Sequence, residues 1–273
     1  MPNLSITSVQ NPRIKDAIKL RDRRQRNKQQ RFVIDGAREV DRALAAGVDL
    51  VEIFVCEELC HSPESQSVLQ RLAERTGSAA PGCEVWPVTP QVMAKLAFGD
   101  RAEGVVAVAR ARARRLSDLT IPENPLVAVL AGIEKPGNLG AILRSADGAG
   151  VDAVLIVDGG TDLENPNAIR ASLGTIFQVP SAVASADEVL DWLRKRGFRI
   201  FAARLDAQLD HTQADLRGPT ALVLGSEAAG LDPRWTAADV TPIRLPMRGI
   251  ADSLNVSATA AVLFYEALRQ RGR

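Results

Sequence analysis

LVAVLAGIEKPGNLGAILRSADGAG, residues 126–150, has the pattern of a buried strand, a tight turn and a helix. The first eight residues are almost all apolar, which is typical of a parallel strand covered on both faces. Pro-Gly then leads into apolar residues at helical spacing. We expect Asn138 at the N-cap of this helix, with Arg144 two turns further on about the face of Asn138 and Ile142. This order predicts a parallel α/β domain.

The rest of the C-terminal half repeats the alternation of strand and helix. A helix, ADEVLDWLRKR, ends before Gly197. The chain closes with SLNVSATAAVLFYEALRQR, a predicted long helix that starts at Ser253 and ends in arginines, as the helix dipole favours. Further buried strands are predicted at AVLIV (153–157), FRIFAA (198–203) and TALVLG (220–225). We therefore assign residues 126–273 to one domain.

The N-terminal part alternates shorter strands and helices, which predicts a small three-layer α/β domain over residues 1–110. Residues 111–125, ARARRLSDLTIPENP, lack periodicity and carry charges and two prolines, so they are predicted to be a linker. The predicted strands of the small domain are FVID (32–35), VEIFVC (51–56), CEVWPV (83–88) and GVVAVAR (104–110).

Composition indicates a soluble globular protein. Of 273 residues, 46% are hydrophobic and 25% are charged, and the length allows one large domain or two ordinary ones. Apolar runs stay well short of the roughly 18 residues that cross a bilayer. The opening MPNLSITSVQ lacks the charged and apolar regions of a secretion signal. We expect a cytoplasmic protein.

The net charge is only +1, but the basic residues are clustered. Nine Lys or Arg residues and two Asp residues lie between Arg13 and Arg31, and a second cluster follows in residues 110–115. Condensed basic segments suit a polyanionic partner. The alternative is a solvated helix face and a charged linker.

The three cysteines, Cys56, Cys60 and Cys83, are too few and of the wrong parity for a disulfide framework. With His61 they could surround zinc, but CxxxCH is not a common zinc spacing, so we expect ordinary thiols and no metal. His211 lies in a polar stretch, where a surface position is expected. No Ser-His-Asp arrangement is evident.

Three loops follow predicted strands, and open parallel sheets bind ligands at these strand ends. The glycines of the first, residues 134–150, could admit an anion to a helix N-terminus, although a tight turn without a ligand has the same pattern. The second, LGSEAAGLDP (224–233), holds Glu227 between two glycines directly after a buried strand. A carboxylate there stabilises the fold little, which favours a role in binding a ligand or fixing the loop.

In the third segment, residues 243–261, a predicted strand ends in Leu-Pro-Met, and a glycine-containing loop leads into the last helix through Ser253, Leu254 and Asn255. An ordinary N-cap explains Ser253 without any ligand. Asn255 is expected inside the first turn, where asparagine is a poor helix former, and this favours a functional role.

Together the three loops resemble the motifs of the SpoU/TrmH branch of the SPOUT methyltransferases over residues 126–271. The N-terminal part resembles the substrate-binding domain often fused to this family, similar to ribosomal proteins that grip kinked RNA, in NPRIK, FVIDGAREV and GVVAVAR. Lys135 departs from the aspartate often found there, and we expect it to point away from the reacting atoms. The matching positions are Asn138, Gly140 and Arg144, then Gly225, Ser226, Glu227 and Gly230, then Pro246, Met247 and Ser253 to Ser257.

The resemblance implies a catalytic α/β domain with a trefoil knot, a homodimer formed through it, and 2′-O-methylation of ribose in RNA. A separate RNA-binding domain favours ribosomal RNA of the 23S type over transfer RNA. In the family, the knotted loops bind S-adenosylmethionine in a bent shape, mostly through backbone groups. The positions that correspond here are Leu224, Gly225, Gly230, Ile243, Leu245, Ser253 and Leu254.

The resemblance also implies a catalytic set. The corresponding arginine has been proposed as the general base, but guanidinium seldom gives up a proton. We therefore expect Arg144 to hold the adjacent phosphate and stabilise developing negative charge, while substrate phosphate or water accepts the proton. Asn138 would orient the ribose or the arginine, Glu227 would fix the arginine and loop, and Ser253 and Asn255 would complete the pocket.

Two other classes of protein compete with this interpretation. A catalytically idle RNA-binding protein would use the same basic N-terminal surface, but it would not need the intact motif residues. A nucleotide-dependent oxidoreductase would share the parallel strands and glycine turns. However, the G-x-G-x-x-G pattern is missing after the first strand of the larger domain.

Overall fold

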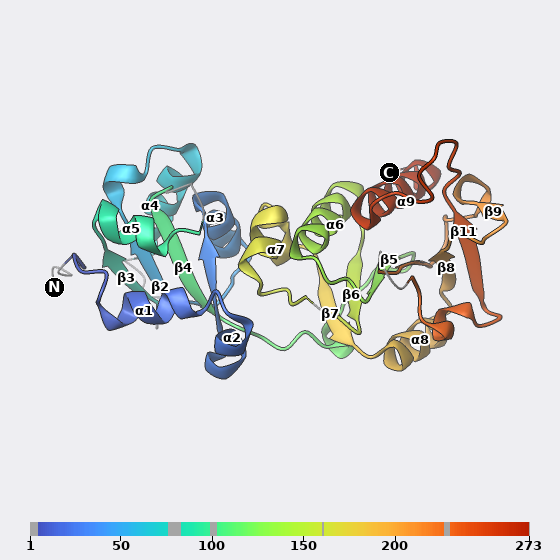
Figure 1. The fold of residues 1–273 in the computed structure, drawn as a ribbon, viewed down its shortest axis with the longest axis horizontal. Coiled ribbons are helices and arrows are strands. Elements are labelled where there is room, and N and C mark those ends of the chain that lie inside the picture. The colour runs from blue at the N-terminus through green and yellow to red at the C-terminus, as the bar shows by residue number, and fades with distance from the viewer. Residues whose placement is uncertain (1–4, 76–82, 99–102, 160, 227–229, 273) are drawn as a thin grey trace. The chain divides into compact units, whose positions relative to one another are not determined.

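The computed structural model describes residues 5–75, 83–98, 103–159, 161–226 and 230–272. They form two units, each built on its own β-sheet (Figure 1). Unit 1 comprises Met1–Arg112 and Leu163–Gln178, and unit 2 comprises Ala113–Asp162 and Val179–Arg273. The sequence-based division had placed Leu163–Gln178 in the second domain.

Unit 1 contains a mixed four-stranded sheet in the order β1-β4-β2-β3. β4 is antiparallel to β1 and β2, and β3 is parallel to β2. Alternate residues of β4, Val106 and Val108, pack with α1 and α5, while α3 and α4 cover the other face. The elements are β1 (Arg31–Asp35), β2 (Leu50–Val55), β3 (Glu84–Pro87), β4 (Val105–Arg110), α1 (Pro12–Lys19), α2 (Arg23–Gln29), α3 (Ala37–Ala45), α4 (Pro63–Arg75) and α5 (Pro90–Leu96).

The segment Leu163–Gln178 contributes a short helix, α7 (Pro166–Ala171), and a 3-10 turn to unit 1. Phe177 stacks on Phe32 of β1, with ring centroids 6.3 Å apart. The Arg42 guanidinium donates to the Leu173 carbonyl oxygen at 2.7 Å. Aromatic packing and a hydrogen bond therefore hold this segment to unit 1, and neither could be read from local periodicity.

Unit 2 contains a seven-stranded sheet in the order β7-β6-β5-β10-β8-β11-β9, and every neighbouring pair is parallel. This confirms the predicted parallel α/β fold. α8 and Trp235 pack on one face, whereas α6 and α9 pack together on the other (Figure 1). The elements are β5 (Leu126–Ala131), β6 (Ala153–Val157), β7 (Ser181–Ala184), β8 (Arg199–Ala203), β9 (Leu209–Asp210), β10 (Thr220–Leu224), β11 (Val240–Arg244), α6 (Pro136–Ala149), α8 (Ala186–Lys195) and α9 (Val256–Arg271).

The strand order places β10 between β5 and β8, although β10 follows both along the chain. The carboxyl ends of β8, β10 and β11 therefore lie at the same edge of the sheet. The trefoil knot that the family resemblance implies stays a prediction. Among the described helices, none has the length and apolar character to cross a bilayer.

The charged segment 111–125 is held against unit 2 from Ala113 onwards. Leu116, Leu119 and Ile121 pack on the core, and the Arg114 carbonyl oxygen accepts from the Val183 backbone N–H at 2.9 Å. The apolar residues among the charges therefore attach this segment to the sheet, although it contains no regular element longer than one 3-10 turn.

Two helix starts differ from the sequence-based expectation. The N-cap of α6 is Lys135 and Pro136 occupies N1, so Asn138 lies inside the first turn. Proline at N1 is favourable because its missing N–H would have had no helical partner. The N-cap of α9 is Asn255, whose Oδ1 accepts from the Ser257 N–H at 2.9 Å, so Ser253 lies in the preceding loop.

The expected face of Arg144 is also corrected. Ile142 is fully buried, whereas Arg144 is exposed. Arg144 lies six positions after Asn138, which turns the helix by about 240° beyond a full revolution. Arg144 therefore does not share the face of either residue.

Candidate active site

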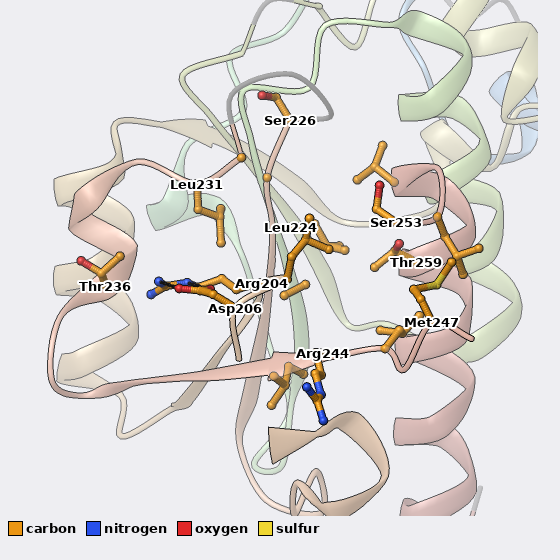
Figure 2. A pocket seen from close by; sticks show the side chains of 18 residues that line it. Arg204, Asp206, Leu224, Ser226, Leu231, Thr236, Arg244, Met247, Ser253 and Thr259 are labelled. Carbon is orange, nitrogen blue, oxygen red and sulfur yellow. Dashed lines mark hydrogen bonds and ion pairs between the residues drawn. The ribbon is translucent and has the colours of Figure 1, made fainter. Parts of the chain in front are cut away.

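A cavity of about 520 Å³, the strand-end cavity, lies at the carboxyl ends of β8, β10 and β11 (Figure 2). Leu231 and Thr236 lie on one side, and Met247, Ser253 and Thr259 lie on the other. The structure thus brings together three loops that are distant in sequence. Its lining includes all seven positions singled out for the methyl donor, namely Leu224, Gly225, Gly230, Ile243, Leu245, Ser253 and Leu254.

The loop after β10 closes on itself through backbone hydrogen bonds. The Ser226 N–H donates to the Gly230 carbonyl oxygen at 3.2 Å, and the Gly230 N–H donates to the Ser226 oxygen at 3.1 Å. A Cβ at Gly225 would lie 2.5 Å from the Gly230 oxygen, and Gly230 itself has φ +67°. Both glycines are therefore needed to form this wall. Glu227 lies outside the described residues.

Two arginines that line the strand-end cavity are neutralised by carboxylates. The Arg204 guanidinium contacts both Asp206 oxygens, at 2.9 and 2.5 Å, and this hydrogen bonding lowers the pKa of Asp206. The Arg244 Nε donates to Asp210 Oδ1 at 2.8 Å. The remaining wall is largely apolar side chains and backbone, which suits a ligand with a flat apolar part and a few polar groups.

A second, smaller hollow of about 200 Å³, the side cavity, is lined by Asn138 and Lys135. It shares Ser226 and Val256 with the strand-end cavity, so the two hollows adjoin. Lys135 thus lines the same hollow as Asn138, and the expectation that its side chain points away from the reacting atoms stays a prediction.

The first and third loops meet at two asparagines. The Asn255 Nδ2 donates to Asn138 Oδ1 at 3.3 Å, and Asn255 Oδ1 caps α9. Arg144 is exposed on α6 and lines neither the strand-end cavity nor the side cavity. The structure therefore groups Asn138, Asn255 and Ser253 around adjoining hollows and leaves Arg144 open to solvent.

Three residues near the site were not predicted. Arg204 and Asp206 line the strand-end cavity, and their position directly after the predicted strand 198–203 was a usable signal. Buried Thr161 donates from Oγ1 to the Glu134 carbonyl oxygen at 2.6 Å and so fixes the loop before α6. No local pattern indicated Thr161, because its partner lies 27 positions away.

The cysteine cluster is part of the core of unit 1. Cys56 and Cys60 are buried, the Cys60 thiol donates to the Cys56 carbonyl oxygen at 3.3 Å, and burial raises the pKa of both thiols. Within the ranges that the structure describes, no three His, Cys, Asp or Glu side chains are placed to hold a metal ion.

Comparison with known proteins covers both units. Residues 125–265 match the SpoU rRNA Methylase family, and residues 11–107 match the MRM3-like substrate binding domain. The 23S rRNA (guanosine(2553)-2′-O)-methyltransferase of Bacillus subtilis is 29% identical over 262 residues, which is 95% of this chain and 97% of the relative.

Solved structures agree with this assignment. An RNA 2′-O ribose methyltransferase is 43% identical, with TM-score 0.83, over 99% of this chain and 100% of its own. The S-adenosylmethionine-bound rRNA methyltransferase from Sinorhizobium meliloti is 28% identical, with TM-score 0.86, over 97% of each chain. With the motif residues gathered at one edge of a parallel sheet, these matches show that the chain belongs to the SpoU rRNA methylase family.

Proposed function

We propose that this protein transfers a methyl group from S-adenosylmethionine to a ribose 2′-hydroxyl of ribosomal RNA, of the 23S type. The observation that carries the proposal is the convergence of seven residues from the second and third loops on one strand-end cavity, beside Asn138 of the first loop. The B. subtilis relative acts on 23S rRNA, and the S. meliloti structure holds the same donor, which supports the proposal.

The strand-end cavity suits the donor. Its volume falls within the roughly 300–1,000 Å³ of small-molecule sites. Leu224, Ile243 and Leu245 provide apolar walls, and the paired backbones of Ser226 and Gly230 lie at the edge. When bound, S-adenosylmethionine supplies a methyl group on a positively charged sulfur that leaves as a neutral thioether, so no general acid is needed.

The protein's task is then to position a hydroxyl that is barely ionised at neutral pH and to favour its alkoxide character. Arg144 holds a substrate phosphate and stabilises the developing negative charge, and its exposure leaves it within reach of a large RNA. Asn138, fixed by Asn255, orients the ribose, and Ser253 completes the pocket. Glu227 fixes the arginine and the loop, and substrate phosphate or water accepts the proton.

The protein acts in the cytoplasm as a homodimer that associates through unit 2. Several large apolar side chains of α9 and the loop before it are exposed: Ile250, Leu254, Val262 and Tyr265, the last of these 52% exposed. A surface of this kind is typical of an interface. Sedimentation of the purified protein tests this directly, and a monomer at micromolar concentration would contradict it.

A substitution at Arg144 distinguishes donor binding from methyl transfer, because Arg144 lies outside the strand-end cavity. We expect Arg144→Ala to bind S-adenosylmethionine with unchanged affinity by isothermal titration while methyl transfer to ribosomal RNA falls by about 10²-fold or more. Arg144→Lys should keep partial activity, since the charge remains. Lys195→Ala, which removes an exposed cation from α8, is the matched control and should keep full activity.

The same measurements test the alternative of an idle RNA-binding protein. Wild-type protein that binds RNA but neither binds S-adenosylmethionine nor methylates ribosomal RNA would establish the alternative. Undiminished transfer by Arg144→Ala would remove Arg144 from the mechanism without affecting the assignment of the cavity.

A further inference from the structure

Unit 1 brings the end of the first basic cluster of the sequence beside the start of the second. β1 pairs with β4 so that Arg31 lies opposite Arg110. Beyond the strand ends, the Ala111 N–H donates to the Gln30 carbonyl oxygen at 2.9 Å. The end of the first cluster and the start of the second, about 80 positions apart, are therefore neighbours. We define the α2 surface as Arg23, Arg24, Lys28, Arg31, Arg110 and Arg112.

The helix α2, RRQRNKQ, contains no apolar residue. A short helix that is polar all round gains little from hydrophobic packing, so other contacts must hold it. Asp22 caps its first turn by accepting from the Gln25 N–H at 3.1 Å. Arg26 is only 3% exposed, and its guanidinium donates to the carbonyl oxygens of Leu20 and Arg21 at 3.1 and 2.8 Å.

One arginine thus anchors α2 from inside, while Arg23, Arg24 and Lys28 are exposed. Arg24 and Lys28 are four residues apart, which places them about 5–6 Å from each other on one side of the helix. Nothing in the packing of unit 1 requires cations at these positions. Their presence on a helix with no apolar residue points to a partner that binds the charges.

The charges of the α2 surface are largely not neutralised. Among the residues that the structure describes, Arg24, Lys28 and Arg31 have no ion pair, and neither has Arg112. Arg110 contacts Asp49 at 3.2 Å, and both side chains are exposed. In addition, like charges directly opposite on paired strands, as at Arg31 and Arg110, destabilise a sheet.

Several exposed arginines of unit 2 are paired with carboxylates, unlike Arg24 of the α2 surface. Arg194 contacts Asp239 at 2.7 Å and Arg217 contacts Asp215 at 2.9 Å, which leaves little net charge around them. Other exposed cations without an ion pair to a described residue, such as Arg144 and Lys195, lie elsewhere in the chain. The α2 surface differs from them because it places several such cations on one short helix and at the adjoining ends of β1 and β4.

We propose that the α2 surface binds the phosphate backbone of the RNA substrate and positions it without reading its sequence. This inference rests on the proposed function and adds the surface through which unit 1 holds the RNA. Lys and Arg on a helix and strand end, with no aromatic residue among them, match phosphate contacts rather than base recognition. Binding should therefore weaken steeply with salt.

The test is Arg24→Glu combined with Lys28→Glu in the full-length protein. We expect the Kd for a 23S ribosomal RNA transcript to rise by about tenfold or more at moderate salt. The slope of log Kd against log salt concentration should fall by roughly 1.5, since each lost phosphate contact contributes about 0.7–0.9. Affinity for S-adenosylmethionine should not change.

Lys15→Glu combined with Lys95→Glu is the matched control, since it makes the same change in net charge at exposed positions of unit 1 outside the α2 surface. An equal loss in the control, or wild-type RNA affinity in the α2 variant, would overturn the inference. If the glutamate variant does not fold, Arg24→Gln with Lys28→Gln should still lower the salt slope. Failure of the wild-type protein to methylate RNA would instead count against the proposed function.

Discussion

The two units each contain a large cavity, and the larger one is not the better candidate for the donor. The strand-end cavity of unit 2 measures about 520 Å³, and a second cavity in unit 1, the acidic cavity, measures about 630 Å³. The first is lined largely by apolar side chains and backbone, and its arginines, Arg204 and Arg244, are each paired with an aspartate. Four carboxylates and two guanidiniums line the second, from Asp35, Glu39, Glu64, Glu103, Arg38 and Arg170.

The acidic cavity lies where several chain segments of unit 1 meet and bind one another. Asp35 accepts from the Phe98 N–H at 2.5 Å and lies 3.8 Å from Arg170 of α7. Arg170 also donates to the Phe98 carbonyl oxygen. The Glu103 carboxylate accepts from the Ala37 N–H at 3.0 Å. These polar groups of the acidic cavity bind other groups of unit 1. The apolar wall of the strand-end cavity stays open to a ligand. The residues that line the two cavities, rather than their volumes, therefore indicate which of them binds the donor.

The largest expected effect concerns the wall of the strand-end cavity. In Gly225→Ala the new Cβ would lie 2.5 Å from the Gly230 carbonyl oxygen, so the loop must open. We expect affinity for S-adenosylmethionine to fall by about 10²-fold, or nearly 3 kcal/mol, by isothermal titration. Gly249→Ala is the control, because a Cβ there meets nothing within 4 Å. Equal affinities of the two variants for S-adenosylmethionine would show that the donor does not bind in the strand-end cavity. The acidic cavity would then be the next candidate.

A smaller effect is expected at the junction of the strand-end and side cavities. Asn255→Asp keeps an oxygen to cap α9 but cannot donate to Asn138. We expect kcat to fall by about tenfold with little change in thermal stability or donor affinity. Asn255→Ala also removes the cap and should lower the free energy of unfolding by about 1 kcal/mol. Full activity in the aspartate variant would show that Asn255 only caps α9 and that its hydrogen bond to Asn138 does not contribute to methyl transfer.

The smallest effect concerns the acidic cavity. Burial raises the pKa of Asp35 from its ordinary value near 3.8 to about 6, so between these values the folded state holds a proton that the unfolded state has lost. The free energy of unfolding should therefore fall by about 1 kcal/mol from pH 5 to pH 7. Asp35→Asn should reduce this loss, because its side chain stays neutral and can still accept from the Phe98 N–H.

Hydrogen exchange of the β4 amides, compared at pH 5 and pH 7, measures this loss within unit 1. Glu39 contributes a slope of the same sign, because burial also raises its pKa, so the variant keeps part of the dependence. Asp16→Asn is the control, since Asp16 is exposed. An unaltered slope in Asp35→Asn would show that Asp35 is not the buried acid that titrates. Donor affinity should not change in either variant.

Much of the architecture could be predicted from local patterns. Continuous apolar runs such as 126–131 and 153–157 became central parallel strands, because burial on both faces demands an apolar residue at every position. Strands β7 and β9 were not predicted, since the small residues of β7, SAVA, do not alternate between apolar and polar and β9 has only two residues. The helix α7 has six residues, which are too few to show a helical period, and it was not predicted either.

The sequence by itself determined the parallel sheet of unit 2 and the residue types at its strand ends, because hydrophobic periodicity and motif spacing are properties of contiguous segments. Only the tertiary structure decided that Asn255 caps α9 and contacts Asn138, that Arg144 is exposed apart from the cavities, and that Arg31 lies opposite Arg110. Pairing between distant segments depends on how the elements pack together, and no local pattern records that.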